Sequence, residues 1–399
     1  MKKRVIVVGG GIVGLATAWK LAMSGAGIRI TVLEKEQKTG AHQTGNNSGV
    51  LHCGLAYKPG SMKARLAVTG IREMIEFCRR WEIPHEMCGK LVVAGSEEER
   101  KRMLKVAENG RANGLKGIRE VDRTEMLKIE PHAGGVAGLH VAEEGIVDYS
   151  AVGETLAREL KKQGHEVICS AEVVSTEREN GEWQIRTNDS EYGAEFLINC
   201  AGLQCDRVSV MAGEKRETRI VPFRGEYFKL ANGGEHLVKN LIYPVPDPGF
   251  PFLGVHFTRL VAGGVEAGPN AVLAFAREGY AMRNIVIRDL WDAVSFPGLW
   301  IFMARHLKMS MHEFLISSSR RLFCRALQKL VPEIQPEHLA PGGAGVRAQA
   351  MSPDGTLVQD FELLDRDDAL HVLNAPSPAA TASLAIGGVV ADRVRRRLN

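Results

Sequence analysis

The sequence lacks the features of a disulfide scaffold, a zinc site or a nucleic-acid-binding surface. Its seven cysteines are scattered over 399 residues, and no two of them form a Cys-x-x-Cys pair. This spacing predicts neither a disulfide framework nor a metal centre, and it favours a reducing, cytoplasmic compartment. Lysine and arginine number 51 against 47 aspartate and glutamate residues, so the chain has no strong positive charge with which to hold nucleic acid.

A membrane-spanning segment is not expected either. Residues 369–391 contain no Asp, Glu, Lys or Arg, and a segment of this length could cross a bilayer. His371, Asn374, Pro376 and Pro378 interrupt it, however, and they predict a strand, a loop and a helix instead. Hydrophobic residues make up 45% and charged residues 25% of the chain, which is typical of a globular protein with two or three domains.

The N-terminal residues have the pattern of a βαβ unit. Residues 4–8 form a short β-branched run, residues 15–25 have helical periodicity, and residues 30–36 form a second strand-like run. The glycine-rich segment 9–14 lies between the first strand and the helix. This order of elements is that of the dinucleotide-binding fold.

The glycines of this unit have the spacing GxGxxG. Gly9 allows a tight turn, Gly11 lets the backbone approach a pyrophosphate, and Gly14 lets the helix pack closely on the strand. Glu34 follows about 20 residues later and is expected to accept hydrogen bonds from a ribose. The motif predicts a dinucleotide site but leaves FAD and NAD open.

The rest of the chain alternates between strands and helices. Residues 149–164 have the pattern of an amphipathic helix, and strand-like runs follow at 165–177, 182–188 and 195–202. The block 219–268 is rich in aromatic and β-branched residues and is interrupted by proline and glycine, as in a mixed or antiparallel sheet. Residues 289–331 are helical in character, and residues 384–398 form a closing helix.

Six longer blocks carry a resemblance to a known family, at residues 42–64, 221–228, 240–259, 268–280, 344–355 and 374–383. The sequence resembles the FAD-dependent L-2-hydroxyglutarate oxidases and dehydrogenases, within the glycine oxidase and D-amino-acid oxidase superfamily. The likeness covers nearly the whole chain. It implies an α/β fold with a Rossmann-type FAD-binding domain and a second substrate domain built on a mixed or antiparallel sheet.

The resemblance also implies domain boundaries and cofactor contacts. The FAD-binding domain would comprise residues 1–80, 146–215 and 335–399, and the substrate domain residues 81–145 and 216–334. The GxGxxG loop and Glu34 would hold the ADP part of FAD, the 43–49 loop would wrap the pyrophosphate and ring, and Val173 would lie near the adenine. The cofactor-binding set is Gly9, Gly11, Gly14, Glu34, Lys35, Gln43, Thr44, Ser48, Gly49, Val173, Gly202, Ser377, Ala379, Ala380 and Thr381.

Oxidation of a 2-hydroxy acid needs a group that takes the hydroxyl proton, and histidine is suited to this role at neutral pH. His52 and His256 lie in the blocks of strongest resemblance, and the sequence does not rank them. The resemblance implies that Arg347 binds the substrate carboxylate, because glycine oxidases carry a carboxylate-binding arginine at the matching position, and a guanidinium can bond both carboxylate oxygens. Arg259 and Arg224 are candidates for a second carboxylate, although Arg224 could instead pair with nearby Glu226.

The predicted function is oxidation of L-2-hydroxyglutarate to 2-oxoglutarate, with electrons passed to a quinone or to oxygen. The alternatives are a related flavin oxidase of an amino acid or another hydroxy acid, and an FAD-binding protein with a scaffold role. Aromatic and basic residues mix between 291 and 325, including Trp291, Phe296, Trp300 and Phe302. They either pack their own domain or rest on the inner membrane as a peripheral contact near a quinone pool.

Overall fold

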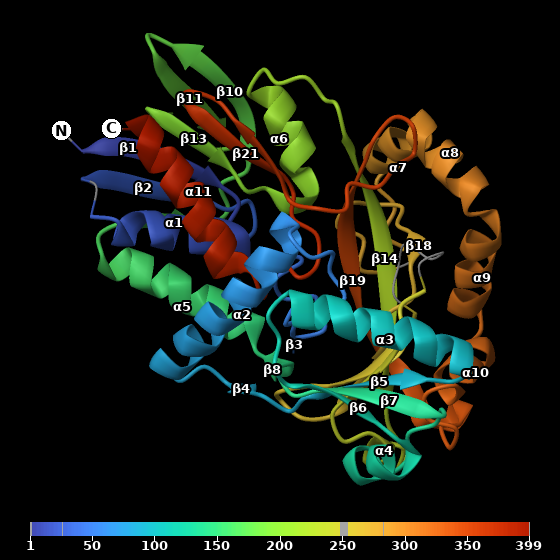
Figure 1. Cartoon of the computed structure of the whole chain (residues 1–399). Coiled ribbons are helices and arrows are strands. Elements are labelled where there is room, and N and C mark those ends of the chain that lie inside the picture. Colours follow the sequence, from blue (N-terminus) through green and yellow to red (C-terminus); the bar gives the residue numbers. More distant parts are fainter. Residues whose placement is uncertain (1, 26, 248–253, 282, 399) are drawn as a thin grey trace.

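The computed structural model of the chain describes residues 2–25, 27–247, 254–281 and 283–398. A parallel sheet covered by helices lies beside a larger mixed sheet (Figure 1). This arrangement confirms the predicted α/β fold with a Rossmann-type unit and a second sheet. Residues 248–253, which belong to one block of the resemblance and include the start of a strand-like run, lie outside the described residues.

The first sheet contains the predicted βαβ unit. Its strand order is β20 (Glu362–Asp365), β21 (Ala369–Asn374), β13 (Phe196–Asn199), β1 (Lys3–Val8), β2 (Ile28–Leu33) and β9 (Glu166–Ile168). All neighbouring pairs are parallel except β20 and β21. Helix α1 (Ile12–Met23) connects β1 to β2, as the glycine motif predicts.

Both faces of this sheet are covered, which explains its continuous apolar strands. Val5 and Val7 contact the helical side, and Ile6 and Val8 contact the opposite side, because successive side chains alternate along a strand. The helical side is formed by α1, α2 (Met62–Arg80), α5 (Tyr149–Lys162) and α11 (Ser383–Leu398). The other side carries α6 (Cys205–Met211) and a three-stranded antiparallel sheet of β10 (Val173–Glu179), β11 (Glu182–Thr187) and β12 (Glu191–Ala194).

The larger sheet is mixed, as predicted for the substrate domain. Its order is β18 (Val272–Leu273), β14 (Arg219–Leu230), β17 (Val265–Gly268), β16 (His256–Arg259), β15 (Leu241–Pro244), β5 (Lys90–Ala94), β7 (Ala137–Val141) and β6 (Ile118–Val121). Strand β19 (Leu339–Met351) pairs with β14 along its whole length. Residues 339–351 therefore belong to this sheet, although the sequence assigns 335–399 to the FAD-binding domain.

Helices pack on both faces of the larger sheet. They are α3 (Glu97–Ala112), α4 (Arg123–Ile129), α7 (Ile287–Val294), α8 (Pro297–Arg305), α9 (Leu307–Ser318) and α10 (Arg320–Gln328). Phe323 and Leu327 of α10 pack on Phe257 of β16, as the helical pattern predicts. Helices α7 to α10 follow one another along one edge of the molecule (Figure 1). Among the described residues, none of the helices is both long and apolar enough to cross a membrane.

A small fourth sheet joins the two parts of the molecule. Strand β8 (Gly145–Val147) lies between β3 (Val50–Leu51) and β4 (His85–Glu86) and pairs antiparallel with both. It brings the segment after β3 beside the turn before β8. His52 and Glu144, which follow and precede the paired residues Leu51 and Gly145, meet at this point.

The contact between α1 and α11 requires a glycine, and this can be tested. A Cβ atom at Gly387 would lie 2.7 Å from the backbone of Ala16, whereas one at Gly388 would meet no atom within 4 Å. We expect Gly387→Ala to destabilise the protein by about 1–3 kcal/mol through overpacking. Gly388→Ala should leave stability unchanged or raise it by up to about 1 kcal/mol. Denaturant unfolding measures both, and equal effects would contradict the close helix contact.

Candidate active site

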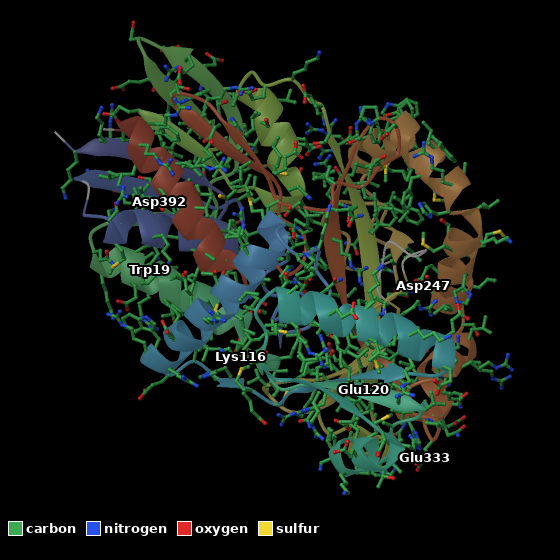
Figure 2. The ribbon with its side chains drawn as sticks, viewed as in Figure 1. Trp19, Lys116, Glu120, Asp247, Glu333 and Asp392 are labelled. Atoms are coloured by element: carbon green, nitrogen blue, oxygen red, sulfur yellow. The ribbon has the colours of Figure 1, made fainter. Side chains whose placement is uncertain are left out.

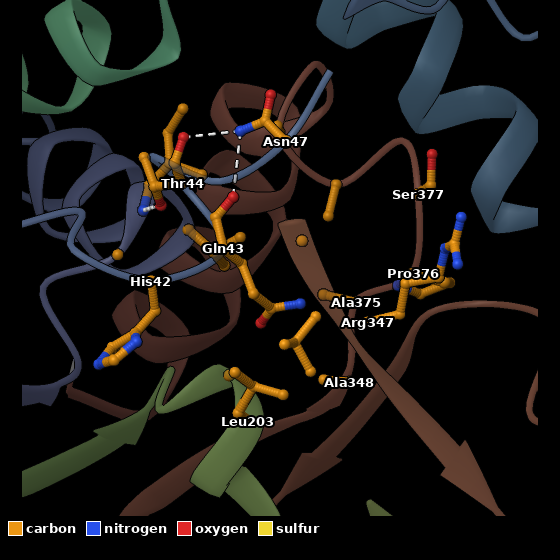
Figure 3. Close-up of a pocket in the computed structure, with 18 of the residues that line it drawn as sticks. His42, Gln43, Thr44, Asn47, Leu203, Arg347, Ala348, Ala375, Pro376 and Ser377 are labelled. Atoms are coloured by element: carbon orange, nitrogen blue, oxygen red, sulfur yellow. Dashed lines mark hydrogen bonds between the residues drawn. The ribbon is translucent and has the colours of Figure 1, made fainter. Parts of the chain in front are cut away.

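A large cavity lies where the carboxyl edge of the parallel sheet meets the larger sheet. Its volume is about 1030 Å³, which is at the upper end of the range for small-molecule and cofactor pockets. Figure 3 shows part of its lining, with His42 and Gln43 from the 42–49 loop, Leu203, and Arg347 of β19 around the same space. The cavity therefore joins the predicted cofactor site to the predicted substrate domain.

The three motif glycines have different surroundings. Gly9 has a φ of +108°, and a Cβ there would lie 2.5 Å from the Cys200 carbonyl oxygen. A Cβ at Gly14 would lie 2.0 Å from the Gly9 oxygen, so both positions are closed to larger residues by the fold. A Cβ at Gly11 would meet only Thr44 Oγ1, at 3.6 Å, and would otherwise project into open space. Gly9 and Gly11 line the cavity, and Gly14 lies behind them.

Glu34 lies at the end of β2 beside this turn. Its carboxylate accepts hydrogen bonds from the backbone N–H groups of Gly10, at 2.8 Å, and Glu36, at 2.9 Å. Lys35 also lines the cavity, and its Nζ lies 2.8 Å from Glu278 Oε2. Val173, at the start of β10, borders the same end. These residues surround the position that the sequence predicts for the ribose and adenine.

The 42–49 loop passes over the N-terminus of α1. Thr44 Oγ1 accepts a hydrogen bond of 2.9 Å from Ile12 N–H, in a helix whose N-cap residue, Gly11, has no side chain to do so. Asn47 donates from its amide to the carbonyls of Gln43 and Thr44 and so stiffens the turn (Figure 3). Of the predicted contacts here, Gln43, Thr44 and Ser48 line the cavity, and Gly49 adjoins them with a φ of +66°.

The loop before α11 closes the opposite side. Ser377, Ala379, Ala380 and Thr381 all line the cavity, as does Gly202 from the other wall. Thr381 Oγ1 lies 2.6 Å from the Tyr149 hydroxyl and accepts a hydrogen bond from the His52 N–H. The start of α11 therefore faces the cavity, where a helix N-terminus favours negative charge.

These features fit FAD. The cavity offers open space in front of Gly11, a helix N-terminus for a pyrophosphate and a carboxylate in the position for a ribose. The N-terminus of α11 lies near the opposite end of the cavity. The residues that would hold FAD are therefore the GxGxxG turn, Glu34, the 42–49 loop and the 377–381 loop.

His52 is held by a buried carboxylate. Its Nδ1 lies 3.2 Å from Oε2 of Glu144, whose side chain is only 1% exposed. A carboxylate accepts, so Nδ1 donates in this contact, and in a neutral imidazole Nε2 is then the acceptor. Burial by itself would raise the pKa of Glu144, but Lys90 and His52 outweigh it and hold that pKa below its ordinary value.

His256 lies on the cavity face of β16. Its Nδ1 donates to the carbonyl of Gly254 at 2.9 Å, and its ring stacks on Tyr243 with a centroid separation of 3.9 Å. Burial lowers the pKa of His256 to about 3, so this ring is neutral at physiological pH. Both histidines line the cavity, and the Tyr243 ring lies between them and contacts each.

Arg347 is the predicted arginine that lines the cavity. Its Nη1 donates to the carbonyl of Asn270 at 3.1 Å. Burial lowers the pKa of Arg347, against the opposing effect of Tyr227 and Glu313. An arginine nevertheless remains charged in proteins. The cavity thus contains a fixed cation beside the two histidines.

Arg259 and Arg224, the candidates for a second carboxylate, are not among the cavity-lining residues. Arg259 comes three residues after His256 in one strand, so alternation turns it to the other face, where it pairs with Glu86. Arg224 is 3% exposed and pairs with Glu226, which is the alternative that the sequence left open. The expectation of substrate contact by either arginine therefore does not fit the geometry.

Sequence reasoning missed several cavity residues: Lys90, Glu144, Tyr57, Tyr227 and Tyr243. Lys90 Nζ lies 2.9 Å from Glu144 Oε1, and both side chains are buried. No local motif marks either residue, because they come from different turns and strand ends. Only the alternation of β5 could have placed Lys90 on the same face as Val92.

Comparison with known proteins gives a family and a fold. Residues 4–393 match the family described as FAD dependent oxidoreductase. The L-2-hydroxyglutarate dehydrogenase of Indibacter alkaliphilus is 48% identical over 398 residues, which cover 100% of both chains. The structure resembles FAD-bound L-alpha-glycerophosphate oxidase from Mycoplasma pneumoniae (TM-score 0.80, 21% identity, 99% and 95% of the two chains covered). It also resembles glycine oxidase from Geobacillus kaustophilus (TM-score 0.73, 18% identity, 99% and 95% covered).

The space in front of Gly11 makes a prediction about cofactor loading. Gly11→Ala should leave the unfolding midpoint of the cofactor-free protein unchanged, since the added Cβ has room. It should lower FAD affinity by about tenfold or more, which corresponds to about 1.4 kcal/mol, because the methyl group occupies the approach of the pyrophosphate. Titration with FAD followed by flavin fluorescence measures this. Gly14→Ala is the contrasting variant and should lower the midpoint itself; unchanged FAD affinity in Gly11→Ala would contradict the assignment.

Proposed function

This chain belongs to the family of FAD-dependent oxidoreductases, and we propose that it oxidises L-2-hydroxyglutarate to 2-oxoglutarate. The observation that carries the proposal is the shared cavity, in which Arg347, His52 and His256 lie in continuity with the GxGxxG turn. The full-length similarity to a protein named L-2-hydroxyglutarate dehydrogenase supports this choice of substrate.

The residues of the cavity indicate which parts of the reaction the protein performs and which require FAD. Bound FAD would supply the hydride acceptor for the alcohol carbon, which is chemistry that protein side chains do not supply. The protein must bind the acid, orient its alcohol and take the hydroxyl proton. Arg347 binds the carboxylate next to the alcohol through its guanidinium.

His52 is the better placed of the two histidines to act as the base. Its partner Glu144 stabilises the imidazolium that forms when Nε2 takes the proton, as a carboxylate does behind a catalytic histidine. His256 has a carbonyl as its Nδ1 partner, and burial lowers its pKa to about 3, so it holds an added proton poorly. We assign His256 to hydrogen bonding with the substrate.

The reaction is tested by mixing the FAD-loaded protein with acids in the absence of oxygen. L-2-hydroxyglutarate should bleach the flavin absorbance, and its D-enantiomer and L-glutamate should not. L-glutamate is the matched control, because it replaces the hydroxyl by an amine and retains both carboxylates. Bleaching by L-glutamate with release of ammonia would instead support an amino-acid oxidase, and bleaching by none of these acids would reject the proposal.

The role of Arg347 gives a second test. Arg347→Met should lower kcat/KM for the diacid by about 10- to 100-fold, because a hydrogen bond to a charged group contributes about 1.5–3 kcal/mol. Arg259→Met is the matched control and should change kcat/KM by less than about threefold, since Arg259 pairs with Glu86 outside the cavity lining. Equal losses in the two variants would contradict the assignment of Arg347.

We further propose that the protein binds peripherally to an anionic membrane and passes electrons to a quinone there. Helices α7 to α9 lie along one edge of the molecule (Figure 1). These helices and the segment before them expose apolar side chains. Ile287 is 82% exposed, Trp291 70% and Phe314 61%. Arg288, Arg305 and Lys308 are exposed on the same helices, and exposed apolar and basic side chains together are typical of helices that rest on an anionic membrane.

Not all of the aromatic residues noted in the sequence contribute to this surface. Phe296 and Phe302 are buried in a cluster with Phe223 and Met351, whereas Trp291 and Trp300 point to solvent. The two alternatives from the sequence, packing of the domain and contact with a membrane, therefore apply to different residues. One set of side chains packs the domain, and the other set is available for lipid.

Sedimentation with vesicles tests this surface. Wild-type protein should bind vesicles that contain anionic lipid, and Trp291→Glu and Trp300→Glu should weaken binding, because each places a charge where an aromatic ring would enter the interface. Val174→Glu is the control, since Val174 is 47% exposed on β10, away from these helices. Equal sedimentation of all four proteins would end the membrane proposal.

A further inference from the structure

A buried ion pair lies directly behind His52. Glu144 is in the turn between β7 and β8, and its carboxylate has two different sets of partners. Oε2 faces His52 Nδ1 at 3.2 Å, and Oε1 accepts from Lys90 Nζ at 2.9 Å and from the Cys53 N–H at 3.2 Å. The side chains of Glu144 and Lys90 are 1% and 7% exposed.

A charge removed from water to this extent needs compensation. Lys90 supplies it for Glu144, and the ammonium also lies 5.0 Å from the centroid of the Tyr243 ring. The pair is therefore neutral as a unit, and one carboxylate oxygen remains directed at the imidazole. A structural ion pair alone would not require this second contact.

We propose that Glu144 is a positioning residue that keeps the proton of His52 on Nδ1 and leaves Nε2 free to take the substrate hydroxyl proton. Lys90 shares the carboxylate and so limits how strongly Glu144 stabilises the protonated ring. In the step itself the substrate O–H bond breaks, an Nε2–H bond forms, and His52 becomes an imidazolium. The inference rests on the proposed function for the identity of the proton donor.

Loss of Lys90 alone and loss of Lys90 together with the Glu144 charge should shift the pH dependence of kcat/KM in opposite directions. In Lys90→Met, the Glu144 carboxylate no longer has the ammonium as a partner, so His52 should retain its proton to higher pH. The acid limb of the kcat/KM profile, where protonation of His52 removes the base, should therefore move up by about one pH unit. With Lys90→Met and Glu144→Gln together, both charges are lost and the acid limb should move down. An ion pair that only stabilises the fold would not produce shifts of opposite sign.

Other titratable groups around this pair do not compete in the assay range. Burial raises the pKa of the Cys53 thiol and of the neighbouring phenols, and it lowers the pKa of His256 to about 3. Arg347 stays charged. The phenols are those of Tyr57, Tyr149 and Tyr243.

The Gln substitution also tests the tautomer. A glutamine amide can donate to Nδ1, which would move the ring proton to Nε2 and block its use as a base. We expect kcat to fall by about 10²- to 10⁴-fold in the double variant, the range for loss of a general base. The double variant is preferred to Glu144→Gln alone because it leaves no unpaired ammonium in the interior.

The experiment uses FAD-loaded protein labelled with ¹⁵N-histidine, with the His52 signals assigned from a His52→Gln variant. In the wild type, the ring nitrogen shifts should show the proton on Nδ1, and in the double variant they should show it on Nε2. The matched control is Glu333→Gln. Glu333 faces His132 Nδ1 at 2.7 Å and lies at the lower edge of the molecule (Figure 2), so this variant should change the His132 signals alone and leave kcat unchanged.

The outcomes separate this inference from the proposed function. A wild-type His52 protonated on Nε2, or an acid limb that moves in the same direction in both variants, would overturn the positioning role. If the tautomer changes as expected but no 2-hydroxy acid reduces the flavin, the positioning role stands and the proposed function fails. If Lys90→Met does not fold, the wild-type tautomer and the double variant still decide the result.

Discussion

The arrangement of the site depends on the first sheet, whose parallel strands deliver their carboxyl ends to one edge. Gly9 follows β1, Glu34 follows β2, Cys200 follows β13 and Ala375 follows β21, and all four line the same cavity. Loops that leave neighbouring parallel strands in different directions open a crevice at this edge, where such folds bind their ligands. The helix N-terminus at Gly11 then provides the electrostatic preference for phosphate.

The second sheet closes this crevice, and strand alternation divides its residues between core and site. Lys90, Tyr243 and His256 lie on the cavity face, whereas Leu91 and Phe257, their neighbours in sequence, pack in the hydrophobic core. The apolar face anchors the strands, so the polar face is held in a fixed geometry. Burial on that face also explains why its histidine and arginine have lowered pKa values.

Each charged group in this wall of the cavity has a specific partner that compensates for its burial. The Lys90–Glu144 pair stands behind one histidine, while Arg347 donates to a backbone carbonyl and keeps its charge beside the cavity. A cavity with an imidazole acceptor on one side and a fixed cation on another is suited to a hydroxy acid. The edge of the molecule that carries α7 to α9 exposes apolar side chains beside basic ones, and the membrane proposal rests on this surface.

The sequence by itself determined the βαβ unit and the cofactor turn, because these depend on local periodicity and on glycines at fixed spacing, while the six longer blocks were identified through the family resemblance. Tertiary structure alone decided which charged residues share the cavity. Arg259 turns away from it through strand alternation, whereas Lys90 enters it from the start of β5 and Glu144 from the turn before β8, which is distant in sequence. The reason is physical: a local pattern reports which face a side chain occupies, whereas the partner across that face depends on how the two sheets pack together.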